Sequence, residues 1–184
     1  MSKVAIKGAD TGTGVFTLES PATNTDRTLV LPDEAGTVLT TAGVPASAMP
    51  AGSVIQVVES VNTTQQSTTS TSNIATGITA SITPSSSSSK IFVFCNYTGY
   101  ANPAGYSAYY SIYRGATNIT SPQGTRLESA GGTWFGTQVL SILDSPATTS
   151  STTYTLYFSV QSGGTAIVNL GSSPGRMILM EIAA

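Results

Sequence analysis

The sequence predicts an all-β protein, with a short intertwined β region at the N-terminus and an antiparallel β-sandwich head behind it. The first observation is the segment 60–89, whose thirty residues contain no charge and eighteen Ser or Thr, with Ile recurring among them. Thr and Ile favour half-buried strands, whereas disordered segments are rich in charge. The second is the alternation of apolar and polar residues along 154–161. The third is that no segment sustains a helical period of 3.6 residues.

The front region, residues 1–42, contains four short apolar runs separated by Gly, Pro, Asn and Asp, which favour turns. Strands of this length cannot bury a sufficient core, and such short regions usually need metals, disulfides or oligomerisation. No metal-ligand pattern or disulfide is available, so we expect copies of this region to wrap around each other. The four runs are Val4–Ile6, Val15–Leu18, Thr28–Leu31 and Thr37–Leu39.

Residues 43–52 are predicted to be a linker, because Pro45, Pro50 and two glycines interrupt any regular element. The composition also changes here. Residues 1–50 hold eight of the sixteen charged residues, and the remaining 134 residues hold the other eight.

The back region, residues 53–184, is predicted to be the head. Eight short strands separated by Gly, Pro, Asn and Ser turns are typical of an antiparallel sandwich of the jelly-roll type. In the clearest strand, Tyr154, Leu156, Phe158 and Val160 share one face. The candidates are Ser53–Glu59, Ile74–Thr83, Lys90–Tyr97, Tyr106–Arg114, Trp134–Asp144, Tyr154–Gln161, Ala166–Leu170 and Arg176–Ile182.

Two of these strands are apolar on both faces. Tyr, Phe or Ile occupy alternate positions of either parity in Ile91–Tyr97 and in Tyr106–Tyr113. A strand at the surface of a sandwich normally has one polar face. We therefore expect the second face to be covered, and a neighbouring subunit is the candidate.

The composition argues against several classes of partner. Charged residues make up 9% of the chain, against about 25% in typical proteins, and the net charge is −2. We therefore expect neither nucleic-acid binding nor membrane insertion. The first residues have no apolar block of a secretory signal, so synthesis in the cytoplasm is expected. The single cysteine, Cys95, is predicted to be a small buried apolar residue.

The residues also argue against an enzyme. The chain has no His, the commonest general base and metal ligand. A pair of catalytic carboxylates would have to come from the four acids of the back region, which are Glu59, Glu128, Asp144 and Glu181. Arg114, Arg126 and Arg176 are available as their partners or as anchors between subunits. We predict no catalytic residue, no metal site and no cofactor.

Aromatic residues give the best prediction of a binding site. Six tyrosines, Trp134 and Phe135 lie within 97–135, and such rings suit sugar stacking or a protein interface. Those on strands are expected to pack in the core or between subunits. Tyr100, Tyr106 and Trp134 stand nearest to Gly, Asn and Pro, so we expect them in exposed loops. These three are the predicted contacts to a glycan.

Several segments resemble the proteins of bacteriophage virions. The segment GTGVFTLESPATNTDRTLVLPDEAGTVLT resembles a motif near the start of tail-fibre and other appendage proteins, especially of marine phages. The segments ITPSSSSSKIFV, YRGATNI, LDSPATTSSTTYTLYFSVQSGGT and ILMEIAA resemble the C-terminal domain that often accompanies it. The resemblance implies a homotrimeric virion protein with a jelly-roll head similar to tumour-necrosis-factor-like heads. It implies no catalytic residues.

The expected function is therefore that of a structural phage protein: a trimeric fibre or spike appendage that contributes to host attachment. Residues 1–42 would dock on tail or capsid proteins or build a stem, and three weak sites in one trimer would bind by avidity. The alternatives are a capsid decoration (cement) protein and a soluble carbohydrate-binding lectin. A depolymerase is the remaining alternative.

Overall fold

The computed structural model describes residues 11, 13, 48–120, 124–129, 131–161 and 163–184. The chain divides into two units, Met1–Val38 and Leu39–Ala184, and the described residues from 48 onward all belong to the second unit. The predicted front region, apart from residues 11 and 13, and half of the predicted linker lie outside the described residues, so these boundaries stay predictions.

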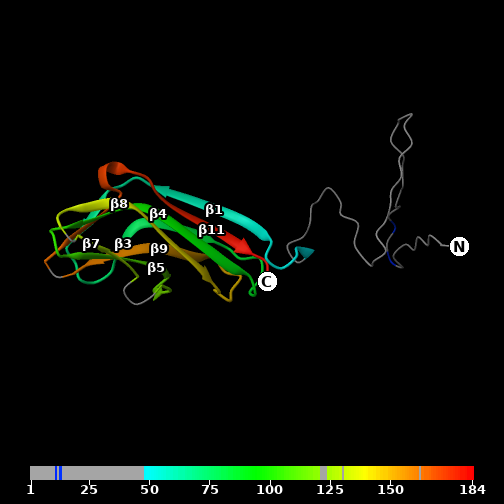
Figure 1. Ribbon diagram of the computed structural model, residues 1–184. Helices are drawn as coiled ribbons and strands as arrows, with labels where there is room; N and C mark the ends of the chain where they lie inside the picture. Colours follow the sequence, from blue (N-terminus) through cyan, green and yellow to red (C-terminus); the bar gives the residue numbers. More distant parts are fainter. Residues whose placement is uncertain (1–10, 12, 14–47, 121–123, 130, 162) are drawn as a thin grey trace, which may run out of the picture. The chain divides into compact units, whose positions relative to one another are not determined.

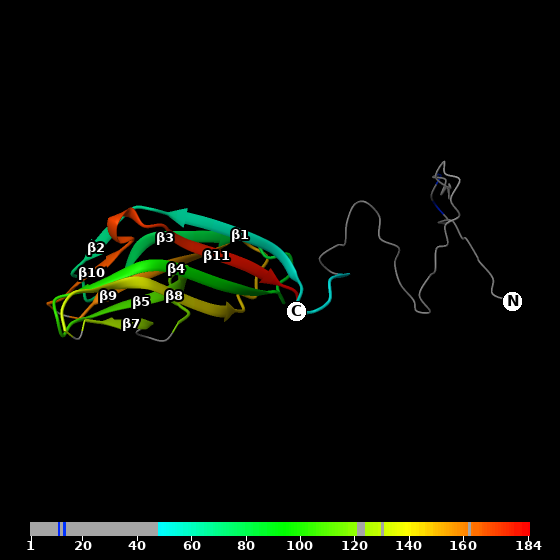
Figure 2. The same cartoon turned by 45° about the horizontal axis from the view of Figure 1, so that its top comes forward.

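The head consists of two stacked antiparallel sheets (Figures 1 and 2). A short 3₁₀ helix, η2 (Leu170–Ser172), precedes the last strand. The strands are β1 (Val54–Asn62), β2 (Gln66–Thr68), β3 (Ile74–Ile82), β4 (Lys90–Asn102), β5 (Ser107–Arg114), β6 (Thr117–Asn118), β7 (Thr125–Glu128), β8 (Trp134–Asp144), β9 (Thr152–Val160), β10 (Thr165–Val168) and β11 (Gly175–Ile182).

The strand order is that of a jelly roll. Sheet A has the path β1-β11-β4, with β8 on the other side of β4, and sheet B has the path β3-β9-β5, with β7 beside β5. The short strands β10 and β2 extend sheet A, and β6 extends sheet B. Because successive long strands pass between the sheets, each sheet contains strands distant in sequence. The predicted fold class of an antiparallel β-sandwich is confirmed.

The core lies between the sheets and follows the predicted alternation. Tyr154, Leu156 and Phe158 are fully buried on the inner face of β9, and Val93 and Leu179 face them from sheet A. Burying a side chain of this size contributes about 1.5–3 kcal/mol. Cys95 is also buried, and burial raises the pKa of its thiol to about 12, so it is an unreactive core residue as predicted.

Polar side chains join the two sheets at opposite ends of the core. At one end, Arg114 Nη1 of β5 donates to both carboxylate oxygens of Asp144 at the end of β8, at 2.9 and 2.8 Å, and Tyr154 donates to the same carboxylate at 2.7 Å. At the other, the Tyr110 hydroxyl donates to the carbonyl of Ile167 at 3.1 Å. These bonds fix one sheet relative to the other.

All eight predicted strands are present, with ends shifted by up to five residues. Three short strands, β2, β6 and β7, were not predicted. They have two to four residues, too few to show a period, and they form only because a longer neighbour offers free backbone groups.

Candidate interaction surfaces

The outer face of sheet A carries many apolar side chains. In the register, Phe92 of β4 lies between Met180 of β11 and Leu143 of β8, and Phe94 lies beside Ile178. Figure 1 shows β1, β11, β4 and β8 side by side in this layer. We call this surface the apolar face. It consists of Val57, Val61, Phe92, Phe94, Phe135, Val139, Leu143, Ile178 and Met180.

The outer strands of the apolar face are the most exposed. Val57 of β1 is 56% exposed, Val139 and Leu143 of β8 are each 52% exposed, and Phe135 is 64% exposed. Contiguous apolar side chains at this exposure mark an interaction site in a soluble protein. The strand β4 therefore has the second apolar side that its sequence predicted, and the isolated chain leaves that side uncovered.

One ion pair lies on the apolar face. Arg176 Nη1 and Glu59 Oε1 are 2.6 Å apart on adjacent strands, and both side chains are nearly half exposed. Such an exposed pair stabilises the fold little. Because the pair is neutral as a unit, it leaves the face without net charge at this point.

The outer face of sheet B is different. Its outward positions on β3 and β9 are hydroxyl residues, which bond across the strands: Thr79 to Thr155 at 2.9 Å and Ser81 to Thr153 at 2.7 Å. We call this surface the hydroxyl face. It also includes Tyr113 of β5 and Tyr157 of β9, whose ring centroids are 4.2 Å apart.

The three predicted glycan contacts lie at one end of the sandwich but on different surfaces. Tyr100 is within β4, on the outer face of sheet A beside Phe135. Trp134 opens β8 opposite the buried Ala101, is 40% exposed, and lies so close to Gly136 that a Cβ there would be 2.8 Å from its ring. Tyr106 packs over the turn at Gly163.

The prediction that all three stand in loops was therefore wrong for Tyr100 and Trp134. The prediction relied on the nearby Gly and Asn, which favour turns. In the structure, β4 continues through Gly99 to Asn102 because β8 and β10 pair with it there. Tyr106 precedes β5 and is half-buried. Whether these residues contact a glycan stays a prediction.

The four acids considered for catalysis each have separate partners. Glu59 pairs with Arg176, Glu128 with Arg126 at 3.1 Å, and Asp144 with Arg114. Glu181 is fully buried and accepts bonds from Ser85 and Gln56. The three arginines considered as subunit anchors thus bind acids of their own chain.

Burial by itself raises the pKa of Glu181, but the bonds from Ser85 and Gln56 outweigh it and hold the pKa below its ordinary value. The carboxylate is therefore charged at neutral pH. It holds the β3–β4 connection against β11 and β1, which is a structural role.

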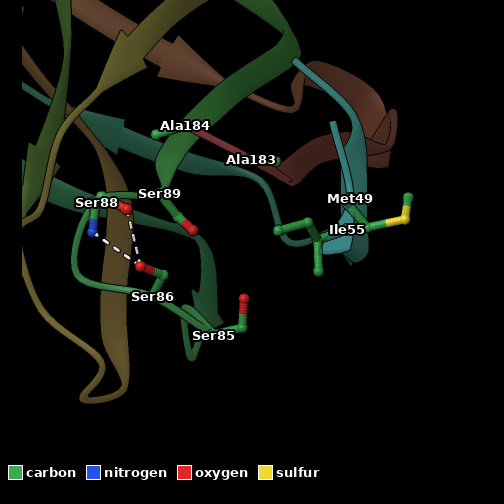
Figure 3. A pocket seen from close by; sticks show the side chains of 8 residues that line it. All are labelled: Met49, Ile55, Ser85, Ser86, Ser88, Ser89, Ala183 and Ala184. Carbon is green, nitrogen blue, oxygen red and sulfur yellow. Dashed lines mark hydrogen bonds between the residues drawn. The ribbon is translucent and has the colours of Figure 1, made fainter. Parts of the chain in front are cut away.

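A pocket of about 360 Å³ lies beside this connection (Figure 3). Its walls are four serines, two alanines at the end of the chain, Met49 and Ile55. Two of the serines already bond to each other, Ser86 to Ser88 at 2.9 Å. None of these eight residues has an aromatic, acidic or basic side chain. In the described part of the chain, no group of three or more Cys, Asp or Glu residues is placed to hold a metal ion.

Neither a family model nor a curated protein matches this chain. Among solved structures, it is similar to a mutant VP2 protein of infectious bursal disease virus in derived T=1 particles, with 14% identity and a TM-score of 0.37 over 72% of this chain and 37% of that one. The Gt strain of the same virus gives 15% identity and a TM-score of 0.35, over 72% and 39% of the two chains. The chain thus spans less than two fifths of their length, and a likeness at these scores carries no functional inference. No helix among the described residues is long and apolar enough to cross a membrane.

Proposed function

We propose that the protein is a non-enzymatic structural component of a bacteriophage virion, a homotrimeric fibre or spike appendage that contributes to host attachment. In this proposal, the heads associate through the apolar face, and residues 1–42 dock on other virion proteins. The observation that carries the proposal is the apolar face itself, because a head with a complete core of its own still exposes a second apolar sheet surface.

The size of the apolar face fits a protein interface. Four strands about 4.8 Å apart and about nine residues long, at 3.3 Å per residue, cover roughly 20 by 30 Å. A stable interface buries about 800 Å² on each partner, so this face is of the right order. Its low charge also fits, since the centres of interfaces are depleted of charged residues.

The remaining features agree with a scaffold. The described acids are bound by arginines or by hydrogen bonds, the single thiol is buried, and no residue that lines the pocket has a titratable side chain. The resemblance of the front segment and of the closing segments to phage appendage proteins supports the place on a virion. A capsid decoration protein is the alternative within the same class.

Two measurements test the proposal. Size-exclusion chromatography of the full chain with light scattering should give three times the monomer mass, and a monomer at micromolar concentration would contradict self-association. Immunogold labelling of phage particles should mark the tail, whereas labelling distributed over the head would favour a decoration protein. No labelling of particles would contradict a virion role.

A further inference from the structure

We propose that the tyrosine pair Tyr113–Tyr157 on the hydroxyl face is a binding site for neutral sugar rings. The proposal rests on the proposed function only in taking host surface glycans as the source of the ligand. It places the glycan contact on sheet B, away from Tyr100, Tyr106 and Trp134.

The geometry of the pair differs from that of the other ring contacts in the described residues. Tyr97–Tyr110 and Tyr110–Phe158 lie in the core, where all three side chains are fully buried. Tyr113 and Tyr157 are instead half-buried on an outer face, with centroids 4.2 Å apart and planes at 34°. The two rings pack against each other and leave part of their surface exposed. We call this pair the ledge, and an exposed aromatic surface of this kind suits the C–H face of a sugar ring.

Polar groups around the ledge can bind sugar hydroxyls. Asn73 Nδ2 donates to the Tyr113 hydroxyl at 2.9 Å, which fixes the orientation of that ring. The Thr155 hydroxyl lies on the strand of Tyr157, directly opposite Tyr113 in the register, and bonds to Thr79. Each hydroxyl has both a donor and two acceptor sites, so capacity remains for a ligand.

The absence of charge at the ledge sets the class of sugar. Tyr113, Tyr157, Asn73, Thr79 and Thr155 are all uncharged, and Arg126 lies opposite Tyr109, four residues along β5 from Tyr113 and so about 13 Å away. Arg126 is also paired with Glu128. Arg114, which follows Tyr113, is bound to Asp144. With no free cation at the ledge among the described residues, neutral sugars fit better than sialic or uronic acids.

The hydroxyl face is also the surface that assembly leaves accessible. Copies that meet through the apolar face cover sheet A, and sheet B is the opposite layer of the sandwich (Figure 1). Three ledges on one particle would strengthen a weak single contact through avidity.

The test is an array of immobilised neutral oligosaccharides, terminating in galactose, glucose or N-acetylglucosamine, beside sialylated ones, probed with the full chain. We expect binding to neutral termini, at least tenfold weaker for Y113A and Y157A. Because these variants could disturb the fold, Thr79→Lys serves as a second variant: position 79 is exposed beside the ledge, and its long charged side chain should also weaken binding tenfold. Circular dichroism checks that each variant is folded.

W134A, at an aromatic residue that belongs neither to the apolar face nor to the ledge, is the matched control and should bind as the wild type does. The proposal is overturned if no neutral glycan binds, if sialylated glycans are preferred, or if W134A loses binding while the T79K and Y157A variants keep it. A silent array would leave the measured oligomeric state and the immunogold labelling unaffected, so failure here is distinct from failure of the proposed function.

Discussion

The outward positions of sheet A include Val57, Val139 and Leu143, whereas those of sheet B include Thr79, Ser81 and Thr153. Both sheets turn a continuous apolar side to the same core, so the inward positions do not distinguish them. The difference lies only in the alternate residues. Hydroxyl residues form hydrogen bonds to each other and to water, so a surface of this kind is stable in contact with solvent. Exposed valines and phenylalanines instead lower the free energy when another protein surface covers them. This difference indicates that the two faces have different neighbours.

The largest expected effect comes from placing a charge on the apolar face. Val139→Glu should weaken self-association at least 100-fold, which is about 2.7 kcal/mol, because a carboxylate would be desolvated in the interface. The matched control is Thr153→Glu, at an exposed position of the hydroxyl face. Light scattering over a dilution series measures both variants. Equal weakening by the two substitutions would contradict the assignment of the apolar face as the interface.

The second prediction concerns the hydrogen bonds that Asp144 of sheet A makes to two residues of sheet B. Asp144→Asn removes the charge that Arg114 and Tyr154 bind between the sheets. The site is partly exposed, with the Arg114 side chain at 31% and that of Asp144 at 11%. We therefore expect a loss of about 2 kcal/mol in the free energy of unfolding, measured in urea. The corresponding substitution Glu128→Gln, in the exposed Arg126–Glu128 pair on β7, should lower the free energy of unfolding by less than about 0.5 kcal/mol.

We expect the stability of the protein to depend on pH through Glu181, whose carboxylate accepts bonds from Gln56 of the edge strand β1 and from Ser85. The pKa of Glu181 is lowered in the folded state. Its contribution to the stability of the fold is therefore present above the ordinary carboxylate pKa, and is lost as the pH falls through the pKa of the folded state. Stability should therefore fall with acid below the ordinary pKa, and Glu181→Gln should flatten that part of the curve. Thermal unfolding from pH 6 to about 2 measures it. Identical slopes in the two proteins would show that other acids are responsible.

The smallest effect is expected on the hydroxyl face. Thr155→Val keeps the shape and removes the bond to Thr79, and cross-strand pairs of this kind contribute about 0.2–1 kcal/mol. Unfolding in urea should shift by no more than that, and the mass in light scattering should not change. A change of oligomeric state would place the hydroxyl face in the interface and reverse the roles of the two faces.

Much of the fold was available from local sequence signals. The alternation in 154–161 predicted which side chains of β9 face the core, and the apolar residues of both parities in Ile91–Tyr97 predicted a second apolar surface. The end of β4 was not predictable, since Tyr100 continues the strand only because partners from β8 and β10 reach it. For the same reason, the three predicted glycan contacts share similar neighbours in the sequence but lie on separate surfaces.

The sequence by itself determined the β class, the inward faces of the long strands, the buried thiol and the low charge, because these depend on composition and on a period of two residues. Only the tertiary structure decided which outward residues share a surface. Sheet order joins β1, β4, β8 and β11 across more than a hundred residues of chain, and it brings Tyr113 beside Tyr157. The sequence of one strand does not identify the distant strand with which it pairs. The apolar face and the tyrosine ledge could therefore be recognised only in the folded structure.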